Sequence, residues 1–106
     1  MKRGDLVTVV VAGDYGKPRP ALIIQADPFE SHLSVVVVPL TTEIRPAPLF
    51  RVIIHPGRDT GLRKISQLMI DKITAVPRTK VGAPIGRADS STMHAVDCAL
   101  AGFLGL

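Results

Sequence analysis

The sequence predicts a single, mainly β domain, an antiparallel sheet or small open barrel with one helix laid on it. Three observations lead to this fold class. The chain has 106 residues, 46% of them hydrophobic, which is enough for one core, and no compositional break suggests a second domain. Short runs of β-branched residues, separated by glycine and proline, fill the chain up to residue 86. After Gly86 the hydrophobic residues recur at helical spacing.

The strands are predicted from β-branched and aromatic residues that are bounded by turn residues. A turn at 12–14 ends the first run, and Pro56 and Gly57 close the fourth. The valines of the third run are nearly continuous, which predicts a strand that is buried on both faces. The predicted strands are 6–11, 21–25, 33–39, 50–55 and 68–76, followed by an extended segment over 80–85.

Arg19 stands between Pro18 and Pro20, just ahead of the second predicted strand. Because proline has no N–H to donate to a strand ladder, we expect Arg19 at the mouth or edge of a strand. Thr41 and Thr42 follow the third predicted strand. These polar side chains therefore belong at strand ends.

The C-terminal helix is predicted from a helical repeat of apolar residues, with Asp89 or Ser90 as its N-terminal cap. Several alanines favour the helix, and Gly102 is tolerated near its end. Cys98 falls near the apolar face, so we expect it to be buried. The residues of the apolar repeat are Met93, Val96, Leu100, Phe103 and Leu104.

Positive charge is concentrated in the middle of the chain. From Arg45 to Arg87 nine basic residues are opposed only by Asp59 and Asp71, a net charge of +7, whereas 1–44 sum to −1 and 88–106 to −2. This pattern is typical of a protein that binds a polyanion. A basic soluble surface gives the same pattern, so charge alone leaves both explanations open.

Other features argue against membrane, secreted and metal-binding classes. No unbroken apolar stretch exceeds four residues, and the basic start of the chain leads into Gly4 and Asp5 instead of an apolar segment. The single cysteine cannot form an internal disulfide, as is usual in a reducing compartment, so we expect a cytoplasmic protein. His32, His55 and His94 lack the spacing of metal ligands, so neither a metal nor a cofactor is expected.

Four short motifs follow one another in a fixed order. They are Gly-Asp-Leu-Val at 4–7, Arg-Pro-Ala at 19–21, Pro-Leu-Thr-Thr at 39–42, and 61–73 with its Ser-Gln-Leu-Met-Ile-Asp-Lys-Ile end. In this order the chain resembles the MazF/PemK toxin family over nearly its whole length, and a C-terminal helix ends both.

The resemblance implies one domain over 1–106, a small SH3-like antiparallel β-barrel with a C-terminal helix, usually a homodimer. By position, Arg19 and Thr41 would be the catalytic pair, with Thr42 and Gln67 beside the RNA. It also implies a toxin that is a sequence-selective endoribonuclease (mRNA interferase), inhibited by an antitoxin whose acidic, partly disordered tail covers the site. We also expect Arg45 and Lys64, from the basic stretch, to contact the RNA.

The chemistry of single-stranded RNA cleavage suits these residue types. RNA carries its own nucleophile, the 2′-hydroxyl, next to the scissile phosphate, so cleavage needs no metal and leaves a 2′,3′-cyclic phosphate and a 5′-hydroxyl. The fork of Arg19 can grip two phosphate oxygens, and Thr41 can donate a hydrogen bond where charge develops. Because arginine deprotonates poorly, Arg19 suits a general acid or an electrostatic clamp better than a general base. The general base is left open.

Three alternatives compete with this hypothesis. A CcdB-like protein would share the fold but bind gyrase through its C-terminal helix, typically with a tryptophan, which this chain lacks. A second ribonuclease scheme would use His32 and His55 as acid and base. A non-catalytic nucleic-acid-binding barrel would stack bases on aromatic rings, of which the chain has Tyr15, Phe29, Phe50 and Phe103.

Overall fold

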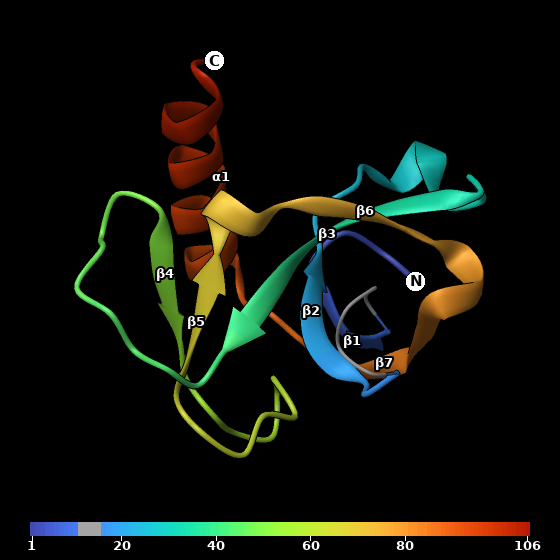
Figure 1. The fold of residues 1–106 in the computed structure, drawn as a ribbon, viewed down its shortest axis with the longest axis horizontal. Helices are drawn as coiled ribbons and strands as arrows, with labels where there is room; N and C mark the ends of the chain where they lie inside the picture. Colours follow the sequence, from blue (N-terminus) through green and yellow to red (C-terminus); the bar gives the residue numbers. More distant parts are fainter. Residues whose placement is uncertain (11–15) are drawn as a thin grey trace.

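Strands dominate the computed structural model, which describes residues 1–10 and 16–106 (Figure 1). The turn predicted at 12–14 lies outside the described residues. The strands are β1 (Asp5–Val9), β2 (Arg19–Ile23), β3 (Ser34–Thr41), β4 (Arg51–Ile54), β5 (Ser66–Met69), β6 (Thr74–Pro77) and β7 (Val81–Arg87). The helices are the 3₁₀ turns η1 (Asp27–Phe29), η2 (Ile70–Lys72) and η3 (Arg78–Lys80), and the α-helix α1 (Ser90–Leu104).

The strands form an antiparallel sheet in the order β4-β5-β3-β2-β1-β7, with β6 also paired to β3. β3 is central: β2 pairs along one side, while β6 and β5 pair with the first and second halves of the other side. The sheet curls strongly, and η3 leads β6 into β7 (Figure 1). The predicted class, an antiparallel β-fold with a C-terminal helix, is confirmed, although the sheet does not close into a complete barrel.

Each face of the sheet is buried by its own core. Leu22 and Val38 belong to the core that α1 covers, and their chain neighbours Ala21 and Val37 belong to the core on the other face. All four are fully buried, so the predicted burial of the valine strand on both faces is confirmed. Burying one such aliphatic side chain contributes about 1.5–3 kcal/mol, and the alternation along β2 and β3 supplies both cores at once.

The helix begins at a cap that the sequence predicts. The Asp89 carboxylate caps it by accepting the Thr92 N–H at 2.8 Å, and this hydrogen bond lowers the pKa of Asp89. Gly105 ends it in the left-handed conformation, with φ 74°. Val96 and Leu100 are buried in the core, and α1 packs against β4 and η2.

One expectation about the helix is wrong. Cys98 is exposed, on the solvent side of α1, with its Sγ 3.7 Å from His94 Nε2. The apolar repeat is only partly buried, because Phe103 and Leu104 are 49% and 50% exposed at the end that extends beyond the sheet. Phe103 still contacts the ring of Phe50, with ring centroids 6.2 Å apart.

The prediction of a single strand over 68–76 is also wrong, because this segment contains parts of two strands, β5 and β6, with the 3₁₀ turn η2 between them. Leu68 pairs with Leu40 of β3, and Thr74 pairs with Val37. The chain thus advances by six residues where β3 advances by three, and the surplus residues form η2. The sequence prediction missed this insertion because it joined the apolar residues on both sides of Asp71 and Lys72 into one strand.

Candidate active site

A cleft of about 530 Å³ opens where β2 begins and β3 ends. Six polar side chains on four different stretches of chain line it: Arg19, Thr41, Thr42, Ser66, Lys72 and Thr74. The apolar part of the lining comes from Pro20, Pro39, Leu40 and Met69. The cleft therefore brings together both residues of the predicted catalytic pair.

Strand register explains why Arg19 and Thr41 meet. β2 and β3 pair antiparallel with Ala21 opposite Pro39, and the same register extended by two residues sets Arg19 opposite Thr41. Residues opposite each other in antiparallel strands point to the same face. Both side chains therefore leave the sheet on one side, at the point where the buried strands end, and Arg19 is exposed there.

Thr41 and Thr42 differ in how they are held. The Thr41 hydroxyl oxygen accepts the Glu43 N–H at 3.1 Å, and the residue is half-buried, whereas Thr42 is exposed. Accepting this bond holds the Thr41 oxygen and leaves its O–H proton for another acceptor. Thr41 is thus the better-positioned donor of the two.

Gln67, which the resemblance places beside the RNA, is buried and is not part of the cleft lining. It is 3% exposed, its amide NH₂ donates to the Arg45 carbonyl at 2.7 Å, and its amide oxygen accepts the Arg45 N–H at 3.0 Å. Both ends of the amide are therefore occupied by the loop that follows β3. Gln67 therefore ties this loop to β5, at the position where β5 pairs with Thr41.

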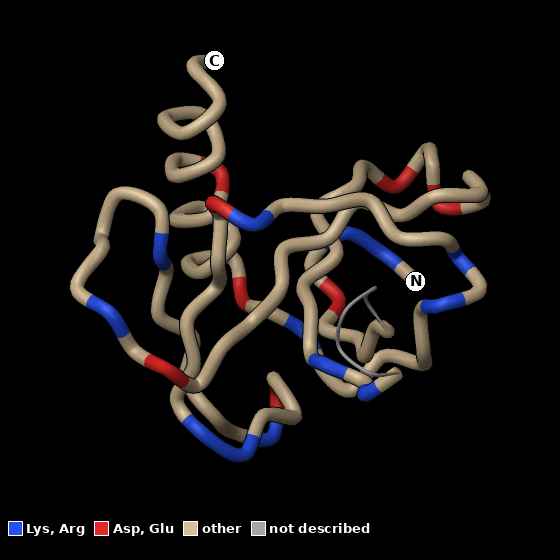
Figure 2. Tube along the Cα trace, in the orientation of Figure 1, with Lys and Arg blue, Asp and Glu red and all other residues tan. Residues whose placement is uncertain are grey.

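Arg45 and Lys64 are exposed on two neighbouring loops, outside the lining of the cleft. Arg45 forms an ion pair with Glu43 at 2.8 Å, and both side chains are largely in solvent. Figure 2 shows basic segments along the loops from β3 to β4 and from β4 to β5. The loops offer positive charge near the cleft, which solvent screens more strongly than charge inside it.

Ser66, Lys72 and Thr74 were not predicted as site residues. Lys72 lies on η2, directly after Asp71, whose two carboxylate oxygens accept from Arg51 at 2.8 and 3.1 Å. The hydrogen bond from Arg51 lowers the pKa of Asp71, and the Arg51 side chain is only 9% exposed. The only signal in the sequence was the place of Lys72 in the basic stretch.

The remaining candidates do not join the cleft. His32 lies before β3 and His55 after β4, and neither is in the lining, which gives the two-histidine scheme no support. Within 1–10 and 16–106, no group of three or more His, Cys, Asp or Glu side chains could hold a metal ion. No helix of the described chain is long and apolar enough to cross a membrane.

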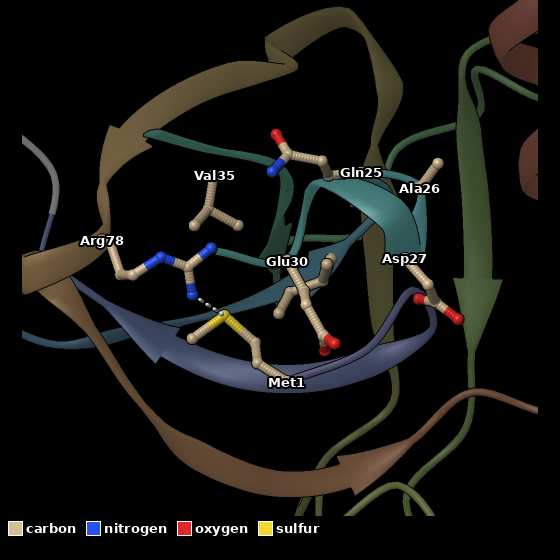
Figure 3. Close-up of a pocket in the computed structure, with 8 residues that line it drawn as sticks. Met1, Gln25, Ala26, Asp27, Glu30, Val35 and Arg78 are labelled. Atoms are coloured by element: carbon tan, nitrogen blue, oxygen red, sulfur yellow. Dashed lines mark hydrogen bonds between the residues drawn. The ribbon is translucent and has the colours of Figure 1, made fainter. Parts of the chain in front are cut away.

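A second hollow, of only about 10 Å³, lies near the start of β3, where Met1 and Val35 line it with Arg78 (Figure 3). Arg78 Nε donates to the His32 carbonyl at 2.7 Å, and Nη1 lies 3.6 Å from Met1 Sδ. The other terminal nitrogen, Nη2, is buried and has no hydrogen-bond partner among the described residues. This space fits about one water molecule, so it is a gap in packing and not a substrate site.

Residues 2–104 match the family described as PemK-like, MazF-like toxin of type II toxin-antitoxin system. A curated relative from Mycolicibacterium smegmatis, named probable endoribonuclease MazF, is 50% identical over 107 residues, covering 100% of this chain and 98% of that protein.

Solved structures resemble this chain over similar lengths. A mycobacterial endoribonuclease in complex with its cognate antitoxin matches with a TM-score of 0.80 and 27% identity, covering 100% of this chain and 96% of that one. The Mycobacterium tuberculosis toxin MazF-mt6 matches with a TM-score of 0.83 and 24% identity, covering 96% and 97%. The second likeness bears on the fold alone.

Proposed function

The chain belongs to the PemK-like, MazF-like family of type II toxins, and from this premise we propose that it cuts single-stranded RNA in the cleft between β2 and β3 without a metal. Two of the relatives described above are named as a probable endoribonuclease and an endoribonuclease, which favours an enzyme over the gyrase-binding alternative. The observation that carries the proposal is that adjacent strands bring Arg19 and Thr41 into the lining of one cleft.

In the proposed reaction the 2′-hydroxyl oxygen of the RNA attacks the neighbouring phosphorus. A P–O2′ bond forms, the P–O5′ bond breaks, and the products are a 2′,3′-cyclic phosphate and a 5′-hydroxyl. The 2′-hydroxyl loses one proton, and the leaving 5′-oxygen gains one. Both bonds change on the substrate itself, so the protein supplies only charge stabilisation and proton management.

Arg19 clamps the phosphate, and Thr41 donates its O–H to the oxygen on which negative charge grows. A donor placed in this way lowers the barrier by about 3 kcal/mol, which corresponds to a rate factor of roughly 100–1,000. Among the described residues lining the cleft, the two charged side chains, Arg19 and Lys72, are cations. Such a lining repels a divalent cation, which needs carboxylate or other oxygen ligands.

The proposal includes two protein partners. One solved relative is in complex with its cognate antitoxin, and we expect an antitoxin with an acidic, partly disordered tail that covers Arg19 and Thr41. The second partner is another copy of the chain, because Leu49, Phe103 and Leu106 leave apolar surface 83%, 49% and 90% exposed. An RNA-cutting toxin of this kind would act in the cytoplasm.

The test is to incubate the protein with single-stranded RNA in EDTA and to identify the ends. We expect cleavage, a 2′,3′-cyclic phosphate and a 5′-hydroxyl. An RNA with 2′-deoxyribose at the mapped cleavage point should resist. Cleavage of that substrate, or loss of activity in EDTA, would overturn the proposed chemistry, and intact RNA with a folded protein would reject the function.

A further inference from the structure

We propose that the cleft binds two phosphates of the RNA, with Lys72 holding a phosphate next to the one at Arg19 and Thr41. The inference rests on the proposed function and deepens it, because it assigns a second backbone subsite to the same cleft. Lys72 acts in binding and positioning, and it does not contact the reacting phosphate.

The two cations of the cleft stand on opposite sides of β3. Arg19 begins β2, which pairs along one side of β3, and Lys72 ends η2, which connects the two strands that pair along the other side. Neighbouring strands are about 4.8 Å apart, so the strands on the two sides of β3 are separated by about two strand spacings, and Lys72 is also displaced along β3 from the level of Arg19. The cleft volume of about 530 Å³ leaves room for more than one phosphate group between them.

The backbone beneath Lys72 is held in place. Ile70 is fully buried, its N–H donates to the Phe50 carbonyl at 3.0 Å, and Asp71 is fixed by its two hydrogen bonds to Arg51. A side chain on such a turn loses less freedom on binding than one on an exposed loop. η2 is therefore a rigid base for a cation.

The charge of Lys72 is also available to a ligand. Asp71, the carboxylate beside it in sequence, accepts from Arg51 through both of its oxygens. Within the described residues Lys72 makes no ion pair, and its side chain is exposed at the cleft. Arg45, by contrast, already pairs with Glu43 and stands outside the cleft. Lys72 is thus the cation best placed for a second phosphate.

The first measurement is the salt dependence of binding to a labelled RNA that carries 2′-deoxyribose at the mapped cleavage point. Lys72→Gln should weaken binding roughly five- to tenfold at low salt and make the log–log slope less negative by about 0.7. Lys72→Arg should retain both values. The matched control is Lys80→Gln, an equal charge change on exposed η3, outside the cleft, and it should leave both values near wild type.

The second measurement identifies the phosphate. A neutral methylphosphonate replaces the linkage on the 5′ or the 3′ side of the scissile one, or the scissile linkage itself. At one of the two neighbouring linkages, the methylphosphonate should weaken binding to the wild-type protein by the same factor as Lys72→Gln weakens binding to unmodified linkages. The same methylphosphonate should not weaken binding to the Lys72→Gln variant any further.

Equal effects of Lys72→Gln and Lys80→Gln would overturn the inference, and so would coupling to the scissile linkage alone. The proposed function fails separately, when the wild-type protein leaves unmodified RNA intact. In that event the unmodified RNA itself serves as the binding probe, so the salt slopes still decide the role of Lys72.

Discussion

The two ends of β3 each lie beside an arginine, and the two arginines have opposite surroundings. At the C-terminal end Arg19 is exposed on the wall of a cleft of about 530 Å³. At the N-terminal end Arg78 borders a space of about 10 Å³, where it is held by the His32 carbonyl and the Met1 sulfur. One arginine faces room for a ligand, and the other joins segments of the fold.

The difference teaches that residue type does not identify a catalytic arginine, whereas its surroundings do. A guanidinium can stabilise a developing charge only where a substrate can enter and where donors beside it point to the same place. In the proposed mechanism Thr41, which lines the same cleft as Arg19, is this donor. Around Arg78 the available groups hold the start of the chain against the sheet.

Replacing Arg19 should have the largest effect. Arg19→Ala should reduce the single-turnover rate of RNA cleavage by at least about 100-fold, because the clamp on the scissile phosphate is lost. The side chain is exposed, so the free energy of unfolding should change by less than about 1 kcal/mol. Rates at saturating protein and urea unfolding of the same sample check both values. Cleavage within a few-fold of wild type would remove Arg19 from the site.

Replacing Arg78 should have the reverse effect. Arg78→Ala should lower the free energy of unfolding by roughly 1–3 kcal/mol, because a hydrogen bond and the packing around Met1 are lost. The cleavage rate on bound RNA should remain near wild type. Urea unfolding and the single-turnover assay test this pair of outcomes. A variant that is stable but inactive would show that the comparison between the two ends of β3 is mistaken.

The Asp71–Arg51 pair should make stability sensitive to acid on the side of the cleft where Lys72 lies. The Arg51 hydrogen bond holds the pKa of Asp71 below its ordinary value of 3.8. The unfolded chain therefore binds a proton first as the pH falls, so the stabilisation is complete above 3.8 and is lost below it. Asp71→Asn should lower the free energy of unfolding at neutral pH. In urea titrations, the difference in unfolding free energy between this variant and the wild type should become smaller below pH 3.8. A difference that does not change with pH would contradict the pairing.

Charge on the outer loops should have the smallest effect. Arg45→Gln, Arg58→Gln and Lys64→Gln should each weaken RNA binding modestly and flatten its salt dependence, because exposed cations contribute screened attraction. The single-turnover rate at saturating protein should stay close to wild type. A loop variant that loses this rate while keeping the salt slope would move the catalytic site toward that loop.

Local patterning was sufficient for most of the fold. The β-branched runs, the prolines around Arg19 and the cap at Asp89 depend on neighbours in sequence, and the strands and α1 follow them. The insertion at η2 was not predictable, because it depends on how Leu68 and Thr74 pair with separate parts of β3.

The same limit applies to the site. Arg19 and Thr41 could be proposed from short motifs, but Lys72 could not, since η2 is fixed by Arg51 from another strand. The burial of Gln67 likewise depends on the Arg45 loop folding back onto it. Contacts between segments distant in sequence decided which polar residues face the cleft.

The most direct test compares two adjacent hydroxyls, Thr41→Ala and Thr42→Ala, in single-turnover cleavage at saturating protein. Both residues line the cleft, so a general disturbance would affect the two variants alike. We predict a loss of at least about 100-fold for Thr41→Ala and less than about fivefold for Thr42→Ala, with Thr41→Ser retaining most of the rate. A near-wild-type rate in folded Thr41→Ala, or the large loss in Thr42→Ala, would contradict the account.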